Sequence, residues 1–287
     1  MQLAKTLSAA FFGFLAGGAA YAQEEVLTSD LPIIGMPQPG GIAFQPAATS
    51  VAQDIHFLDN MLLVIITLIT LFVTMLLVVV AVKFRAGRGH QAARFTHNST
   101  IEIAWTIIPV IILVVIGAFS LPRLFDQLEV PEADVTIKAT GYQWYWGHEY
   151  PDSGIYFESF MLAEDELTEY GYPPETYLLA TDTAVVVPVG AVVKLQTTAA
   201  DVIHAWKIPA FGVHLDAIPG RLNETWFRVD APGIYFGQCS ELCGISHSYM
   251  PITVKAVPQD EYDAWLEAAV ARYADGGGAT TQLAARE

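Results

Sequence analysis

Four residues with metal-binding side chains lie close together in the segment CSELCGISHSYM. Cys239 and Cys243 are the only cysteines of the chain, His247 follows four residues after Cys243, and Met250 follows three residues after that. A further histidine, His204, stands in the segment DVIHAW, at the turn end of an expected strand. Thiolate, imidazole and thioether ligands suit copper better than magnesium or calcium, so this set predicts a soft-metal site.

Other roles for the two cysteines remain open from the residues alone. Two cysteines in an exported chain form a disulfide by default. Zinc on two cysteines and two histidines is the main competing metal, although it would leave Met250 without a role. A single blue-copper site uses one cysteine, two histidines and a weak methionine, so this chain has one cysteine too many for it. Two thiolates that each bridge two copper ions would form a compact pair in which one shared electron changes each bond length little.

The start of the chain predicts export. Residues 1–22 contain one lysine, an apolar centre and the small-residue end Ala20-Tyr21-Ala22, which is the pattern of a cleaved signal peptide. A short first membrane helix is the alternative. After cleavage, residues 23–56 would form an N-terminal segment on the outer side of the membrane.

Two long apolar runs, residues 61–82 and 103–121, predict two membrane-spanning helices, which we place at residues 57–82 and 101–121. The second contains Pro109, which a membrane helix tolerates where neighbouring protein satisfies the freed carbonyl. The loop between them, residues 83–100, carries four basic residues and no acid, and this pattern marks the cytoplasmic side. The rest of the chain is therefore expected outside, with residues 122–258 as one domain.

The exported part is acidic, with 24 acidic and 9 basic residues from position 122 onward, in a chain of net charge −16. This balance argues against nucleic acid and for a cationic partner, which long-range attraction would steer. From Pro131 on, short β-rich runs alternate with turn residues, as in a β-sandwich or barrel. We expect an acidic insertion at residues 164–175, and a helix with a flexible tail at residues 259–287.

Four segments together resemble subunit II of the haem-copper cytochrome c oxidases: GYQWYWGHEY, DVIHAW, DAIPGR and GQCSELCGISHSYMPI. The resemblance runs from the membrane hairpin to about residue 257, and the signal peptide points to a bacterial member. It implies a two-helix transmembrane hairpin followed by a cupredoxin-like Greek-key β-barrel on the periplasmic side of the bacterial inner membrane. It also implies a binuclear copper centre, Cu-A, that accepts electrons from cytochrome c and passes them to haem in subunit I. There oxygen is reduced to water, coupled to proton pumping.

The resemblance also implies a ligand role for each residue of the cluster. His204 and His247 would each bind one copper. Cys239 and Cys243 would bridge both ions. Met250 would be the weak axial ligand of the copper that His204 binds.

Further residues gain roles at the contact with subunit I. The backbone carbonyl of Glu241 is implied to bind the second copper, and its side chain to hold a Mg²⁺ or Mn²⁺ shared with subunit I. Asp216 and Arg221, in HLDAIPGR, are expected near that metal. Subunit III and membrane lipid are the other expected partners.

The family's site of electron acceptance from cytochrome c corresponds to Trp144, as an exposed ring. The acids that guide docking in the family correspond to Glu149, Glu158 and Asp201. From the residue pattern alone, Tyr142, Trp144 and Trp146 would instead share one strand face and belong to the core.

Glu102 opens the second span and is the only acid among basic residues. It is either a helix N-terminal charge, favourable to the helix dipole, or, as in similar subunits, the mouth of a proton path into subunit I. The remaining histidines have no evident partner set and are interpreted as non-ligands: His56, His90, His97, His148 and His214.

Other functions fit the sequence less well. The copper-free subunit II of a quinol oxidase would not need the cysteines. A copper carrier would have no use for the acidic face or for Trp144. An enzyme that reduces nitrous oxide would need more than the 7 histidines present, and no C-x-x-C-H motif marks a fused haem domain. The chain is thus expected to be the electron-accepting part of an oxidase, without oxygen chemistry of its own.

Overall fold

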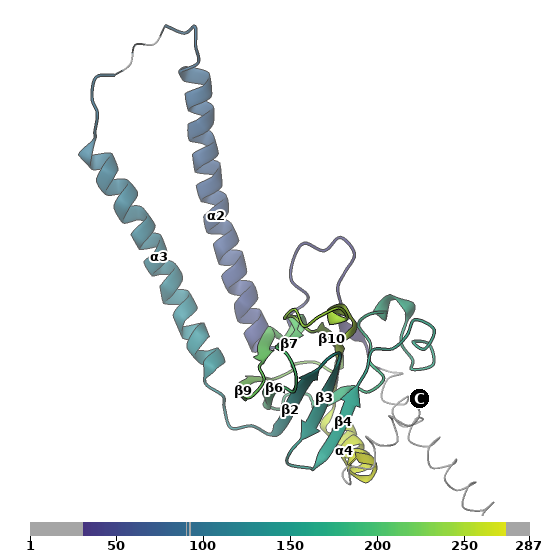
Figure 1. Cartoon of the computed structure of the whole chain (residues 1–287). Helices are drawn as coiled ribbons and strands as arrows, with labels where there is room; N and C mark the ends of the chain where they lie inside the picture. Colours follow the sequence, from purple (N-terminus) through teal and green to yellow (C-terminus); the bar gives the residue numbers. More distant parts are fainter. Residues whose placement is uncertain (1–30, 90, 92, 274–287) are drawn as a thin grey trace, which may run out of the picture. The chain divides into compact units, whose positions relative to one another are not determined.

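The structure is a computed structural model that describes residues 31–89, 91 and 93–273 (Figure 1). The predicted signal peptide, the predicted tail after Tyr273 and His90 lie outside the described residues. The described residues divide into two compact units, a helical one at Asp54–Glu129 and a β-domain formed by residues 31–53 and 130–273.

Two long helices carry the apolar sequence, α2 (Ser50–Lys83) and α3 (Ser99–Leu128) (Figure 1). Both are long and apolar enough to cross a membrane. Each helix extends past its predicted span, because α2 begins at Ser50 and not at residue 57, while α3 continues to Leu128 and not to residue 121. The apolar run marks only the stretch that suits lipid, whereas backbone hydrogen bonding continues into flanking residues that also favour a helix.

Arg123 joins the outer ends of the two helices within the helical unit. Its guanidinium Nε donates to the carboxylate of Asp54 at 2.9 Å. The same guanidinium lies over the ring of Phe57, 4.3 Å from the centroid. This contact, together with the tilted Phe57–Phe119 ring pair at 6.1 Å, holds α2 against α3.

The β-domain is built from two mixed sheets and a separate hairpin. The larger sheet has the order β4 (Ile155–Ser159), β3 (Tyr145–Tyr150), β2 (Val135–Tyr142), β6 (Val193–Ala199) and β9 (Asn223–Phe227). The smaller sheet has the order β1 (Ile33–Gly35), β10 (Gly233–Gln238), β11 (Pro251–Val257) and β5 (Val185–Pro188). The hairpin pairs β7 (His204–Ile208) with β8 (Val213–Ala217). Two apolar helices followed by a β-domain confirm the predicted class.

Short helical segments complete the domain. The 3₁₀ turns are η1 (Pro174–Thr176), η2 (Pro209–Phe211) and η3 (His247–Tyr249). The predicted C-terminal helix is present as α4 (Gln259–Tyr273). Its Trp265 lies against Tyr150 of β3, with ring centroids 5.3 Å apart.

The main core lies between the sheets, where alternate residues of each strand point inward. β6 alternates buried and half-buried positions along its whole length, as expected for a strand with one face in the core. Large rings fill the centre, and Phe211 packs on Phe227 with centroids 5.0 Å apart. Cys239, Cys243 and Met250 belong to the same buried cluster. The candidate metal ligands are therefore a continuation of the core.

One prediction about strand faces is wrong. Gln143 and Trp144 form the turn of the β2–β3 hairpin, and Tyr142 pairs with Tyr145 across it. The Tyr142 and Tyr145 rings stack at 4.7 Å, whereas Trp146 pairs with Gly141 and is buried on the opposite face. The turn breaks the alternation of side chains, so the three aromatic residues do not share one strand face.

The acidic insertion has a small core of its own. Leu167 and Tyr172 are buried together with Ile234 and Phe236 of β10. These β10 residues alternate with Tyr235, which lies in the main core, so the insertion covers the other face of this strand. The acids of residues 164–175 are exposed on the surface of this insertion.

Candidate metal centre

The cluster is assembled from one strand end and one loop. His204 is the first residue of β7, and the loop of residues 239–250 connects β10 to β11. Backbone hydrogen bonds close the loop, since Cys239 N donates to Met250 O at 3.3 Å. Ser240 N donates to Ala205 O at 3.0 Å and so attaches the loop to β7.

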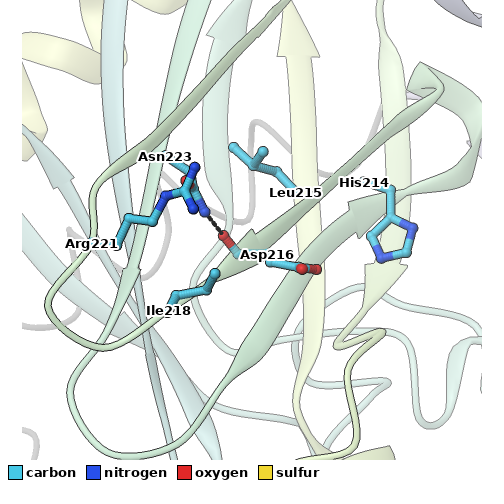
Figure 2. Close-up of a pocket in the computed structure, with 6 residues that line it drawn as sticks. All are labelled: His214, Leu215, Asp216, Ile218, Arg221 and Asn223. Atoms are coloured by element: carbon cyan, nitrogen blue, oxygen red, sulfur yellow. Dashed lines mark hydrogen bonds between the residues drawn. The ribbon is translucent and has the colours of Figure 1, made fainter.

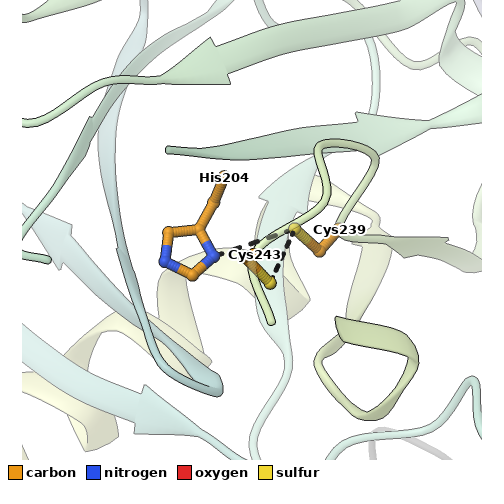
Figure 3. A group of neighbouring side chains, drawn as sticks. All are labelled: His204, Cys239 and Cys243. Atoms are coloured by element: carbon orange, nitrogen blue, oxygen red, sulfur yellow. Dashed lines mark hydrogen bonds between the residues drawn. The ribbon is translucent and has the colours of Figure 1, made fainter. Parts of the chain in front are cut away.

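The donor atoms converge at distances that suit shared metal ions. Figure 3 shows the His204 imidazole turned toward the two cysteine sulfurs. His204 Nδ1 lies 3.8 Å from Cys239 Sγ, and Cys239 Sγ lies 3.9 Å from Cys243 Sγ. Cys243 Sγ is also 3.4 Å from His247 Nδ1 and 3.5 Å from Met250 Sδ. Ligands at about 2.0–2.3 Å around a tetrahedral ion lie roughly 3.3–3.8 Å apart, so the donor set fits soft-metal binding.

Two alternatives from the sequence can be compared with this geometry. Both cysteines are free thiols, so the disulfide is not formed. The thioether of Met250 is only 2% exposed and lies within the cluster, and a simple zinc site on two cysteines and two histidines would not use it. The carbonyl oxygen of Glu241 lies 3.3 Å from Cys239 Sγ and is a sixth candidate metal ligand.

Burial and hydrogen bonding shift the pKa values of the two thiols and of the His204 imidazole. Burial opposes charge on both Cys239 and His204, but their hydrogen bonds outweigh it. Cys239 interacts with His204 and with the backbone of Ala205 and Glu241, and His204 interacts with Cys239 and Asp201. The pKa of the Cys239 thiol is thus lowered, and the pKa of the His204 imidazole is raised. Burial, together with the nearby Cys239 charge, raises the pKa of Cys243 to about 12. Two thiolates this close need the positive charge of a metal to coexist.

Packing leaves His204 no room to turn. Its side chain has 0% exposure. A Cβ atom added to Gly141 of β2 would lie 2.7 Å from His204 Cδ2 and 2.8 Å from Cγ. The absence of a side chain at Gly141 therefore makes space for the imidazole.

Trp144 contacts the cysteine loop directly. Its indole Nε1 donates to the carbonyl oxygen of Cys243 at 3.3 Å, and Gln143 Nε2 donates to the same oxygen at 2.7 Å. Gly244 has φ 129°, and a Cβ there would lie 2.9 Å from Trp144 Cζ2. The half-buried indole thus reaches from the surface to a candidate ligand. Gln143 was missed by sequence reasoning, since only its position next to Trp144 hinted at it.

The three predicted docking acids each have a local partner. Glu149 forms a 2.9 Å ion pair with Lys138. Glu158 is only 8% exposed and accepts from the Tyr156 hydroxyl at 3.2 Å, which leaves little of it for a partner.

Asp201, the third predicted docking acid, touches the cluster itself. Its Oδ1 lies 2.9 Å from His204 Nε2. Burial acts to raise the pKa of Asp201, but hydrogen bonds from His204 and from the backbone N–H groups of Val202 and Gln143 outweigh it and hold the pKa below its usual value.

The residues predicted at the subunit I contact do not join the thiol cluster. Asp216, Arg221 and His214 line an open pocket of about 350 Å³. Figure 2 shows these side chains around it. Asn223 Nδ2 donates to the backbone oxygen of Asp216 at 2.7 Å and shapes this pocket. The Glu241 side chain is exposed.

Glu102 takes part in the N-terminal cap of α3. Its Oε1 accepts from the backbone N–H of Asn98 at 3.3 Å, while Asn98 Oδ1 accepts from Ile101 N at 3.3 Å. This reciprocal capping agrees with the helix-terminal interpretation of Glu102. Glu102 also lines an open pocket with Ser99 and Thr106.

His148 is a buried histidine outside the cluster. It is 1% exposed in β3, and its Nδ1 lies 3.1 Å from Ser159 Oγ. Burial lowers its pKa to about 3, so the ring is neutral in the folded protein.

Comparison with known proteins places this geometry in context. The chain matches the family model of the cytochrome c oxidase subunit II periplasmic domain over residues 135–257, and that of its transmembrane domain over residues 37–122. Cytochrome c oxidase subunit 2 of Cereibacter sphaeroides is 58% identical over 271 residues, covering 90% of this chain and 88% of the relative. Probable cytochrome c oxidase subunit 2 of Rickettsia bellii (strain RML369-C) is 45% identical over 242 residues, covering 84% and 88%. The crystal structure of the periplasmic domain of subunit II (CoxB) of Bradyrhizobium japonicum is 51% identical and covers 50% of this chain and 99% of that one, with a TM-score of 0.46.

Proposed function

The chain belongs to the cytochrome c oxidase subunit II family and is thus a subunit of a haem-copper terminal oxidase; we propose that its β-domain holds the binuclear Cu-A centre through which that oxidase receives electrons. Its two apolar helices serve as a membrane anchor, and its copper-binding domain is periplasmic and cupredoxin-like. One observation carries the proposal. Two thiols, two imidazoles, a thioether and a carbonyl lie in one chain of contacts between 3.3 and 3.9 Å long.

The order of these contacts supports one assignment of ligands. Cys239 lies next to His204, and Cys243 lies next to His247, so each imidazole has its own thiol neighbour. With both sulfurs shared, a copper pair bound here would supply one-electron chemistry with little rearrangement. Met250 and the carbonyl of Glu241 complete the set as weak ligands.

Rigid support for the ligands is part of the function. Cys239 and Cys243 are 5% and 4% exposed, and His204 is held by β7 and by the space at Gly141. Buried, well-packed ligands cannot move far when the charge of the centre changes. This rigidity keeps the reorganisation that accompanies each electron small.

The route into the centre is proposed to begin at Trp144. The indole is half-buried and hydrogen-bonded to the backbone of Cys243, so it joins the surface to a bridging ligand by a single hydrogen bond. We assign cytochrome c as the electron donor. The acidic outer domain suits a basic partner, whose approach it would steer.

The remaining parts of the assignment concern the complex. Electrons would leave for haem in subunit I, with subunit III as a further neighbour, and Glu241 would share a Mg²⁺ or Mn²⁺ with subunit I. Glu102 stays a candidate for the mouth of a proton path. We place the complex in the bacterial inner membrane, with residues 83–100 in the cytoplasm and residues 1–22 removed as a signal peptide.

Rapid mixing of intact oxidase with reduced cytochrome c tests this proposal. Oxidase that carries Cys239→Ser should lose the copper signal and reduce its haem slowly, while a small reductant that acts on haem directly still works. Ser240→Ala is the matched control, because it changes the same loop but keeps the backbone bond to Ala205. Haem reduction by cytochrome c at the wild-type rate in Cys239→Ser would contradict the proposal.

A further inference from the structure

Asp201 makes hydrogen bonds both to a candidate metal ligand and to the β2–β3 turn. Its Oδ1 accepts from the backbone N–H of Val202 at 2.6 Å and lies 2.9 Å from His204 Nε2. Its Oδ2 accepts from the backbone N–H of Gln143 at 2.7 Å. One carboxylate thus contacts a candidate copper ligand and the turn that carries Trp144.

The bond to His204 fixes which ring nitrogen faces the metal. Nδ1 points to Cys239 Sγ, so Nε2 is the nitrogen that carries a proton toward Asp201. A carboxylate bound to the far nitrogen of a ligating histidine orients the ring and makes it a stronger electron donor. The ring is fully buried while the Asp201 side chain is 32% exposed, so the carboxylate reaches the ligand from the surface.

We propose that Asp201 is a positioning residue of the electron-transfer site, which sets the orientation and donor strength of His204 and fixes the turn of Trp144 with its other oxygen. This inference rests on the proposed Cu-A function and assigns Asp201 a role beyond attraction of a cationic partner. It also makes the two coppers unequal. Among the described residues, His247 has no carboxylate within ion-pair distance, so only the ion bound by His204 gains this support.

Two substitutions separate position from charge. Asp201→Asn has a single acceptor oxygen, which cannot serve both His204 and Gln143, and its amide would turn a donor toward one of them. Asp201→Glu keeps the negative charge for a docking partner but moves the carboxylate by one methylene. Glu149→Gln is the matched control, because it removes another acid of the outer domain that pairs with Lys138 and not with a ligand.

Intact oxidase with each subunit variant would be measured in three ways. Pulsed electron paramagnetic resonance reads the hyperfine coupling of the two imidazole nitrogens, a redox titration gives the potential of the copper centre, and a chelator challenge gives copper retention. We expect both Asp201 variants to change the coupling of one imidazole only and to weaken copper retention, by roughly 10- to 100-fold for Asp201→Asn. Asp201→Asn should also raise the potential, since a lost anion destabilises the oxidised state. These changes should persist at high salt and be absent in Glu149→Gln.

A different result would overturn the inference. If Asp201 only guides docking, Asp201→Glu behaves as wild type and Asp201→Asn changes only the salt-dependent KM for cytochrome c, with coupling, potential and retention unchanged. The wild-type spectrum is recorded first. A wild-type oxidase without a two-copper signal from this subunit would contradict the proposed function itself, and would do so before any variant is compared.

Discussion

The indole Nε1 of Trp144 lies 3.3 Å from the carbonyl oxygen of Cys243, so one hydrogen bond joins the half-buried indole to the backbone of a candidate metal ligand. Gln143 donates to the same oxygen at 2.7 Å. The carbonyl therefore keeps a hydrogen-bond donor when the indole is removed. A substitution of Trp144 can thus test its role in electron transfer without changing the structure of the cysteine loop.

Replacing Trp144 by Phe should slow electron transfer from cytochrome c and leave the copper spectrum unchanged. Gln143 still satisfies the Cys243 carbonyl, so the loop keeps its geometry. We expect a decrease of at least about tenfold in the rate of haem reduction, or about 1.4 kcal/mol in activation free energy. Rapid mixing with reduced cytochrome c measures it, with Trp265→Phe on α4 as the control. Equal rates for wild type and Trp144→Phe would remove Trp144 from the route.

Gly141→Ala should displace His204 and abolish normal copper binding. The added methyl would lie 2.7 Å from the ring, and the buried imidazole cannot retreat. Gly233→Ala is the matched control, because its methyl would be equally crowded, 2.8 Å from Ile34 Cδ1, but touches no ligand. Copper content per folded chain should fall only in Gly141→Ala. A full complement of copper in that variant would show that His204 is not a ligand.

Copper uptake should release protons, and the affinity for copper should rise with pH. Burial and the neighbouring Cys239 raise the pKa of Cys243 to about 12, so near neutral pH this thiol is protonated before metal binds. Because copper binds the thiolate, its affinity should rise about tenfold per pH unit for each proton displaced. Calorimetry of the reduced, metal-free chain in buffers of different ionisation enthalpy counts these protons. Cys243→Ser should release fewer, and an affinity that stays flat with pH would contradict the assignment.

Acid should destabilise the β-domain through His148. Burial lowers its pKa to about 3, below the unfolded value of about 6.5, so the stability it contributes is complete above pH 6.5 and is lost as pH falls toward 3. Between about pH 6.5 and pH 5 the loss should be about 2 kcal/mol. Guanidinium unfolding of the chain in detergent should show a smaller acid loss in His148→Phe. Ser159→Ala keeps the buried ring and should lose as much stability in acid as the wild type. The same dependence of unfolding free energy on pH in wild type and His148→Phe would contradict this account.

Much of the fold and of the candidate site could be predicted because the signals are local. The apolar runs identify two helices by composition, and the spacing from Cys239 to Met250 brings soft ligands into one loop. The helix ends differed from prediction, since hydrogen bonding carries α3 beyond its apolar stretch to Leu128.

Contacts between distant segments could not be predicted in the same way. Gln143 and Cys243 are 100 residues apart, and only the packed sandwich brings the β2–β3 turn to the cysteine loop. The prediction that Trp146 shares a strand face with Tyr142 was wrong for a related reason. The position of a turn decides the face of every residue after it, and the sequence pattern did not locate this turn. The bond from Asp201 to His204 spans only three residues, but the sequence does not show that these two side chains point toward each other.

The measurement that tests the central claim most directly is electron paramagnetic resonance of the full-length chain, purified in detergent and loaded with copper. We predict hyperfine structure from two copper nuclei that share one unpaired electron, with two coppers per chain by metal analysis. A pattern from a single copper nucleus, or bound zinc with no signal, would contradict the binuclear centre and with it the proposed role of the chain in accepting electrons.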